Sequence, residues 1–249
     1  MEELVNLLAK IKPETKKEEL DNVFKDVATK LMSEFAIKKG DDYYQMVEIE
    51  FYWYSTHHRD TSTYPRDTKP GNWFLHSSGI DITLKSEKIG NIDDLRSKWG
   101  KGKREKWVNF NFDGCYGGIL IRTLRKFKHD DKNNKVLYKK EEKQNYISGP
   151  WKCCDMLFDY LPCNGKSEDV SRMLPEIIPI NKDDMMPGVG KEFIGQAKRN
   201  GITTKHTKGY ADSPYCFYIN QDYLTGWKNS SFPNKPWNSR KVEFNESPK

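Results

Sequence analysis

The chain has 249 residues, with 42 Lys and Arg against 36 Asp and Glu, which gives a formal net charge of +6. Aromatic residues make up 13% of the chain, which argues against a disordered chain and favours a folded domain. No run approaches the roughly 18 consecutive apolar residues of a membrane span, and the segment Met1-Glu2-Glu3 is acidic where a secretion signal is basic. We therefore expect an intracellular protein that has no membrane partner.

Helical spacing of apolar residues on both sides of Pro13 predicts two helices within residues 1–38, an extension that ends near residue 40. Residues 41–249 are expected to form one domain. Aromatic and β-branched runs predict strands at residues 43–54, 73–76, 80–84, 117–124 and 216–219, in a sheet that is largely antiparallel. Further helices are predicted at residues 151–161 and 190–199. Residues 85–112 are predicted to be a basic, exposed loop insert, and residues 128–145 a hairpin or loop.

Five cysteines are present, and no two of them have the two-residue spacing of a zinc ribbon. The adjacent Cys153 and Cys154 are interpreted as thiols of the core. His57 and His58 have no third ligand at metal spacing. We expect neither a metal nor another cofactor.

Two acidic residues lie in the strand predicted at residues 43–54. Glu48, Glu50 and Tyr52 alternate along it, so their side chains share one face. If that face is buried, the carboxylates need a cationic partner. Arg122, after an apolar run, could be the partner of Glu50 or could reach solvent. The same pattern also fits the solvated side of an edge strand, and spacing alone leaves both interpretations open.

The insert at residues 85–112 carries a group of cations that is flanked by Trp99 and Trp107. Such a group fits phosphate contacts beside an aromatic platform, although a solvated loop has the same composition. The cations are Lys98, Lys101, Lys103, Arg104 and Lys106.

Short motifs in the same order resemble the alkyladenine (3-methylpurine) DNA glycosylase family between about residues 47 and 218. Residues 47–52, VEIEFY, are similar to the family's V-E-T-E-A-Y strand. His57, then TYPRD at 63–67 and KPGNWFLH at 69–76, follow its H, T-P-R-N and K-P-G-x-x-Y-V-Y segments. GILIRTL at 118–124 resembles V-L-I-R-A-L, and SGPWKCCDML at 148–157 resembles N-G-P-x-K-L-C-x-x-L. Residues 188–190 and 214–218 are similar to the closing R-x-G-V and P-x-R-F-Y pieces.

The resemblance implies an α+β fold with a curved, mostly antiparallel sheet and outer helices. It also implies a monofunctional DNA glycosylase that flips a damaged or modified base out of the duplex and hydrolyses its N-glycosidic bond. Glu50 takes the position of the catalytic glutamate, and Arg122 that of the arginine beside it. Tyr52, His57 and His76 are expected to bind the flipped base. Arg66 and the five cations of the insert are expected to contact DNA.

Two departures from the family bear on the substrate. Only Ser77-Ser78-Gly79 follows His76, where the family has the tyrosine that wedges into the duplex. Asp81 replaces an asparagine that rejects bases with an exocyclic amino group, and a carboxylate would accept a hydrogen bond from such an amine. We therefore expect Asp81 to bind the base and the excised base to differ from 3-methyladenine.

The expected partner is double-stranded DNA, with single-stranded DNA as an alternative, and the protein is expected to be a monomer. Two other functions stay open. The chain could be a non-catalytic module that recognises a flipped or single-stranded base, which the missing wedge favours. It could also be a hydrolase or transferase that acts on a small substrate.

Overall fold

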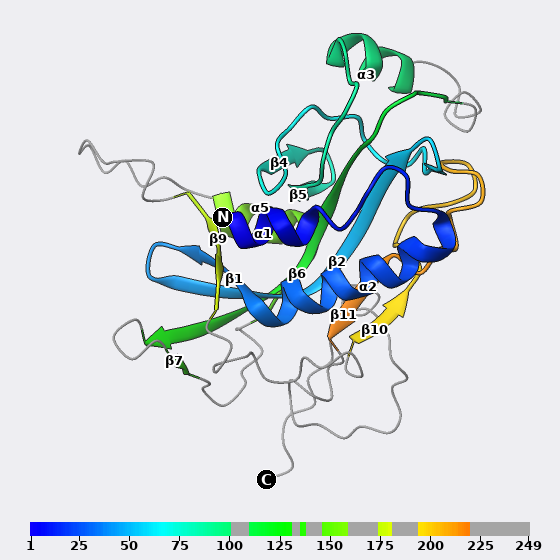
Figure 1. The fold of residues 1–249 in the computed structure, drawn as a ribbon. Coiled ribbons are helices and arrows are strands. Elements are labelled where there is room, and N and C mark those ends of the chain that lie inside the picture. Colours follow the sequence, from blue (N-terminus) through cyan, green and yellow to red (C-terminus); the bar gives the residue numbers. More distant parts are fainter. Residues whose placement is uncertain (101–109, 131–134, 138–145, 159–173, 181–193, 220–249) are drawn as a thin grey trace.

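The computed structural model describes residues 1–100, 110–130, 135–137, 146–158, 174–180 and 194–219, which form an α+β fold around one curled sheet (Figure 1). The described helices are α1 (Glu2–Leu8), α2 (Lys17–Glu34), α3 (Ile92–Gly100) and α5 (Pro150–Phe158). Six strands form the main path of the sheet in the order β10-β11-β2-β6-β5-β4. They are β2 (Asp42–Ser55), β4 (Trp73–His76), β5 (Gly79–Thr83), β6 (Tyr116–Asp130), β10 (Ile194–Ala197) and β11 (Cys216–Ile219).

Every strand pairing of the described residues is antiparallel, as the sequence predicted for most of the sheet. The long strands β2 and β6 pair along most of their length and form its centre. The remaining strands attach to this path: β1 (Phe35–Lys39), β3 (His58–Arg59), β7 (Lys135–Leu137), β8 (Tyr146–Ser148) and β9 (Glu176–Pro179).

The alternation of side chains along β2 gives the sheet two different faces. Val47, Ile49, Phe51 and Trp53 are fully buried in the main core. Helix α2 packs on this face, where the rings of Phe24 and Phe51 stack with centroids 4.5 Å apart. The intervening side chains of Glu48, Glu50 and Tyr52 therefore lie on the other, polar face.

The two N-terminal helices are confirmed, and they share the core of the sheet. Figure 1 shows α1 and α2 lying across one side of the long strands. Their apolar residues, among them Leu4, Leu20 and Phe24, belong to the same buried cluster as β2, β6 and α5. The helical prediction was wrong for its last residues, because Phe35–Lys39 is strand β1. Pairing with β2 on one side and β9 on the other determines this conformation.

Two further predictions need correction. The insert is not a loop throughout, because Ile92–Gly100 forms α3, whose first turn is capped by Asn91 Oδ1 accepting from the Asp93 and Asp94 backbone amides at 3.0 and 3.3 Å. The helix predicted at residues 190–199 is instead strand β10 over Ile194–Ala197, which pairs with β11. Residues 190–193 lie outside the described residues.

The helix predicted at residues 151–161 is confirmed as α5 in its described part, Pro150–Phe158. The hairpin predicted after residue 128 is present where β6 pairs with β7. Within the part of the chain that the structure describes, no helix is long and apolar enough to cross a membrane.

Candidate active site

The sheet register brings residues from three strands together on the polar face. Glu50 lies opposite Leu120 of β6, and Leu120 lies opposite Asp81 of β5. Strand β2 is central, with β11 on its other side, and Glu48 and Glu50 are 1% and 0% exposed. The interpretation of this face as the solvated side of an edge strand was therefore wrong.

Three donors hold the carboxylate of Glu50. Tyr52 donates its hydroxyl to Oε2 at 2.9 Å, and Arg122 Nη1 lies 3.1 Å from the same oxygen. The backbone N–H of Asn200 donates to Oε1 at 2.9 Å. Because a carboxylate offers about four acceptor positions, these three contacts leave one position on Oε1 without a donor among the residues that the structure describes.

Glu48 holds Arg122 from the opposite side. Arg122 Nε lies 3.2 Å from Glu48 Oε1, and Thr123 donates its hydroxyl to Oε2 at 3.1 Å. The pairing of β2 and β6 is irregular at Glu48, which lets the consecutive residues 122 and 123 both contact it. Burial alone would lower the pKa of Arg122, but the charges of Glu50 and Glu48 raise it above its usual value. Arg122 is therefore a fixed cation between two carboxylates.

Tyr52, which is partly exposed, carries its hydroxyl against Glu50. Burial of the hydroxyl and the charge of Glu50 raise the pKa of Tyr52 well above its usual value. The phenol is therefore a hydrogen-bond donor at neutral pH.

Asp81 is the centre of a second buried group on this face. Arg66 forms an ion pair with Asp81 Oδ2, and His76 Nε2 lies 3.0 Å from Oδ1. Burial alone would raise the pKa of Asp81, but the charge of Arg66 and the hydrogen bond from His76 hold it below its usual value. The Arg66 guanidinium also lies over the ring of Phe74, 4.3 Å from its centroid.

This placement changes the role predicted for Arg66. Its side chain is 1% exposed and is held by Asp81, so in this arrangement it does not lie on the surface where a phosphate could reach it. His76 keeps some exposure, at 15% of its side chain, and together with Tyr52 it forms the more accessible part of the polar face.

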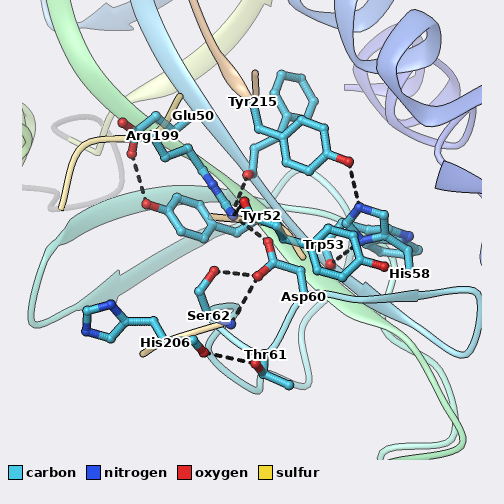
Figure 2. A network of polar contacts seen from close by, with 12 residues as sticks. Glu50, Tyr52, Trp53, His58, Asp60, Thr61, Ser62, Arg199, His206 and Tyr215 are labelled. Atoms are coloured by element: carbon cyan, nitrogen blue, oxygen red, sulfur yellow. Dashed lines mark hydrogen bonds and ion pairs between the residues drawn. The ribbon is translucent and has the colours of Figure 1, made fainter. Parts of the chain in front are cut away.

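A third group, which the sequence analysis missed, is built around Arg199 and Asp60 (Figure 2). These residues are 1% and 0% exposed, and Arg199 Nη1 lies 2.6 Å from Asp60 Oδ2. The segment Arg199-Asn200-Gly201 has the R-x-G spacing of the family's closing motif, which the sequence analysis placed at residues 188–190. Those three residues lie outside the described part of the chain. The spacing at Arg199 is the signal that could have found this group.

His57 and Lys98, the remaining predicted residues that the structure describes, do not join the group around Glu50. His57 is exposed after β2, whereas its neighbour His58 is buried and contacts Trp53 O at 2.9 Å and the Tyr215 hydroxyl at 2.8 Å. Lys98 is exposed on α3 and pairs with Asp94 at 2.7 Å. The other cations of the insert lie outside the described residues: Lys101, Lys103, Arg104 and Lys106.

Helix α3 is attached to the segment that precedes Arg66. Trp99 Nε1 donates to the carbonyl of Thr61 at 3.0 Å, and Arg96 Nε donates to that of Pro65 at 3.2 Å. The described start of the insert therefore packs beside the polar face.

An open cavity of about 760 Å³ lies between α1, the segment after it, and residues 67–70 and 85–86. None of the residues predicted for the site lines it. Among the described residues, no group of three or more His, Cys, Asp or Glu side chains could hold a metal ion.

A scan of the sequence against protein-family models and a search of curated proteins both return no match. The resemblance to the glycosylase family therefore stays a prediction from motif order.

Proposed function

We propose that the protein is a DNA N-glycosylase that flips out a damaged or modified base and hydrolyses its N-glycosidic bond, leaving an abasic site. One observation carries the proposal. Glu50, Tyr52 and Arg122 were selected from two separate motifs, and their side chains meet at one carboxylate oxygen. The resemblance implies that these residues lie together, and this contact supports the proposal.

In this proposal Glu50 is the general base. Arg122 forms an ion pair with the carboxylate, and the attacking water binds at the remaining acceptor position on Oε1. The oxygen of that water bonds to C1′ of the sugar while the bond from C1′ to the base breaks. The base leaves with the electrons of that bond, and the water's proton passes to Glu50. The carboxylate also stabilises the positive charge that develops on the sugar.

The partly exposed side chains of the polar face would receive the flipped base. Flipping costs a few kcal/mol of stacking and pairing, and stacking on an aromatic side chain returns about 1–3 kcal/mol per base. Tyr52 offers an aromatic ring beside the general base, and His76 offers a second ring beside Asp81. Asp81, held ionised by Arg66, would accept from an amino group on the base.

The alternative, a module that recognises a flipped or single-stranded base without cleaving it, is favoured by a different observation. Glu50 is 0% and Arg122 is 5% exposed, so neither side chain reaches solvent in this arrangement. A glycosylase must open a path to Glu50 when DNA binds. A non-catalytic module needs no such path.

The test is to incubate the protein with duplexes that carry alkylated, deaminated, hydroxymethylated or glucosylated bases, and to score abasic sites by alkaline cleavage. The proposal predicts abasic sites on at least one class of duplex. Tight, salt-sensitive binding to a modified duplex with no abasic site on any of them would support the non-catalytic module. Absence of both binding and cleavage would contradict both functions.

The variant Glu50→Gln identifies the general base in the same assay. We expect cleavage to fall about 10²- to 10⁴-fold, because the amide keeps the shape of the side chain but cannot take the water's proton. Binding, measured by fluorescence anisotropy, should stay within about twofold, since Tyr52 and the surface cations are unchanged. Loss of binding in step with cleavage would refute the general-base role.

A further inference from the structure

The side chain of Arg199 connects three parts of the chain that surround Glu50. Its Nη1 donates to Asp60 Oδ2 at 2.6 Å and to the carbonyl of Phe51, in β2, at 3.1 Å. Its Nη2 donates to the carbonyl of Tyr210 at 3.2 Å. The guanidinium thus joins β2, the loop after β3 and the loop before β11, as Figure 2 shows for Asp60 and β2.

Two of the three donors to Glu50 depend on this side chain. Asn200, whose backbone N–H donates to Glu50 Oε1, is the residue next to Arg199, so any shift of Arg199 moves that donor. The guanidinium also lies over the ring of Tyr52, 4.6 Å from its centroid, and Tyr52 donates to Glu50 Oε2.

We propose that Arg199 and Asp60 form a buried clamp that positions the carboxylate of Glu50 through Asn200 and Tyr52. Arg199 is a positioning residue in this account, because it contacts the ring of Tyr52 and the backbone but does not itself reach the reacting atoms. The proposal rests on the glycosylase function only for its effect on cleavage.

Asp60 is fixed in turn by its own loop. Ser62 donates to Asp60 Oδ1 through its backbone N–H at 3.1 Å and its hydroxyl at 2.6 Å, which leaves Oδ2 for Arg199. Burial alone would raise the pKa of Asp60, but the charge of Arg199 and the hydrogen bonds from Arg199 and Ser62 hold it below its usual value. The pair is therefore charged at neutral pH, and its bonds have the strength of charge-assisted hydrogen bonds.

The test compares Arg199→Lys and Asp60→Asn with the wild type. Lysine keeps the positive charge, but one ammonium group cannot reproduce the planar fork that reaches Asp60, Phe51 and Tyr210 together. Asp60→Asn keeps the shape of the Asp60 side chain and removes its charge, so it weakens the same ion pair with Arg199 from the other partner. Thr61→Val is the matched control, because it removes a neighbouring bond between the same two loops, from the Thr61 hydroxyl to His206 O at 2.9 Å.

The first readout needs no activity: hydrogen exchange of the Asn200 backbone amide, followed by NMR. We expect exchange to accelerate about tenfold or more in both clamp variants, because opening of this loop becomes easier, and to stay unchanged in Thr61→Val. Unchanged exchange at Asn200 in both clamp variants overturns the clamp.

The second readout is the single-turnover rate of base release with the modified duplex that the wild type cleaves. We expect a fall of about 10- to 100-fold in the clamp variants, as small displacements of a catalytic group cause, with DNA affinity unchanged within about twofold. Faster exchange with an unchanged cleavage rate overturns the positioning role. If the wild type cleaves no duplex, the glycosylase proposal fails, while amide exchange still decides whether the clamp exists.

Discussion

At the scale of single residues, Glu48 and Glu50 have different partners although they are two positions apart on one strand. Glu50 accepts from Tyr52, Arg122 and the backbone amide of Asn200. Glu48 accepts from Arg122, Thr123 and the thiol of Cys216. Removing two charges from water is costly, and a buried ion pair repays that cost only when its geometry is good and its remaining hydrogen bonds are made. Glu48 supplies that geometry, because it orients the guanidinium that then reaches Glu50.

The variant Glu48→Gln tests whether Glu48 orients Arg122 toward Glu50. The amide puts an NH2 group in place of one of the two oxygens that accept from Arg122 and Thr123, and it removes the charge that pairs with Arg122. We therefore expect the free energy of unfolding to fall by about 1–3 kcal/mol, measured by urea titration. Base release should slow as well, because Arg122 loses its second support. Glu14→Gln changes an exposed carboxylate and should leave both quantities unchanged. A Glu48→Gln variant as stable and active as the wild type would contradict the orienting role of Glu48.

The sequence could identify Glu50, Tyr52 and Arg122 because strand periodicity and motif order both point to them. It missed Asp60 and Arg199, which are separated by 139 positions and lie outside regular elements, so no period of helix or strand selects them. The R-x-G spacing at Arg199 is the one signal that points to the pair. It predicted a DNA contact for Arg66, because nothing local in the sequence shows that Asp81 pairs with it.

At the scale of elements, the backbone of β6 at Gly118 lies very close to the side chains of Arg66 and Asp81. A Cβ atom at Gly118 would clash with Arg66 Nη1 and would lie 2.7 Å from Asp81 Oδ2. Only glycine lets β6 pair with β2 and β5 while this ion pair lies against its backbone. Gly118 therefore allows both the pairing of β6 with its neighbours and the buried ion pair between Arg66 and Asp81.

We predict that Gly118→Ala lowers the free energy of unfolding by about 3 kcal/mol, because the methyl group displaces a buried ion pair in a packed layer. Gly40→Ala is the control. Gly40 has a φ of 58° and open space around its Cβ, so the change should cost only about 1 kcal/mol of backbone strain. Equal midpoints in urea for the two variants would contradict the tight contact at Gly118.

The predicted helices and strands are confirmed where apolar residues keep a regular period over many positions. They are wrong where pairing with a neighbouring strand determines the conformation. Strand β2 is recognisable because apolar and polar residues alternate in it. Residues 194–197 contain Gly and Ala beside Ile and Gln, a composition without a clear period. Pairing with β11 determines their strand conformation. Likewise Phe35–Lys39 continues a helical pattern until pairing with β2 and β9 ends it.

At the scale of the whole molecule, the N-terminal helices cover the apolar face and bury an uncharged histidine near the sheet. The ring of His58 lies 6.3 Å from that of Phe24 in α2, between centroids, and contacts the hydroxyl of Tyr215. Burial lowers the pKa of His58 to about 4 from its usual 6.5. Between about pH 4 and pH 6.5, His58 therefore stays neutral in the folded protein, whereas it accepts a proton in the unfolded chain.

This difference makes stability depend on pH. Above pH 6.5 both states are neutral at His58, and below it the unfolded chain gains a proton that the folded protein refuses until about pH 4. Stability should thus fall as pH falls, by about 2 kcal/mol from pH 7 to pH 5. In His58→Gln this part of the slope should disappear, while His57→Gln, an exposed neighbour, should keep it. Urea midpoints across this range check the prediction, and a His58→Gln slope equal to that of the wild type would contradict it.

The central claim is that Glu50 activates water at a sugar carbon, and the most direct test counts the product of that step. Free base released from a cleaved duplex in a single turnover is quantified by mass spectrometry for the wild type and Glu50→Gln. The account predicts one free base per abasic site from the wild type and a rate about 10²- to 10⁴-fold lower from the variant at equal DNA binding. Release of the base at the wild-type rate by Glu50→Gln would contradict it.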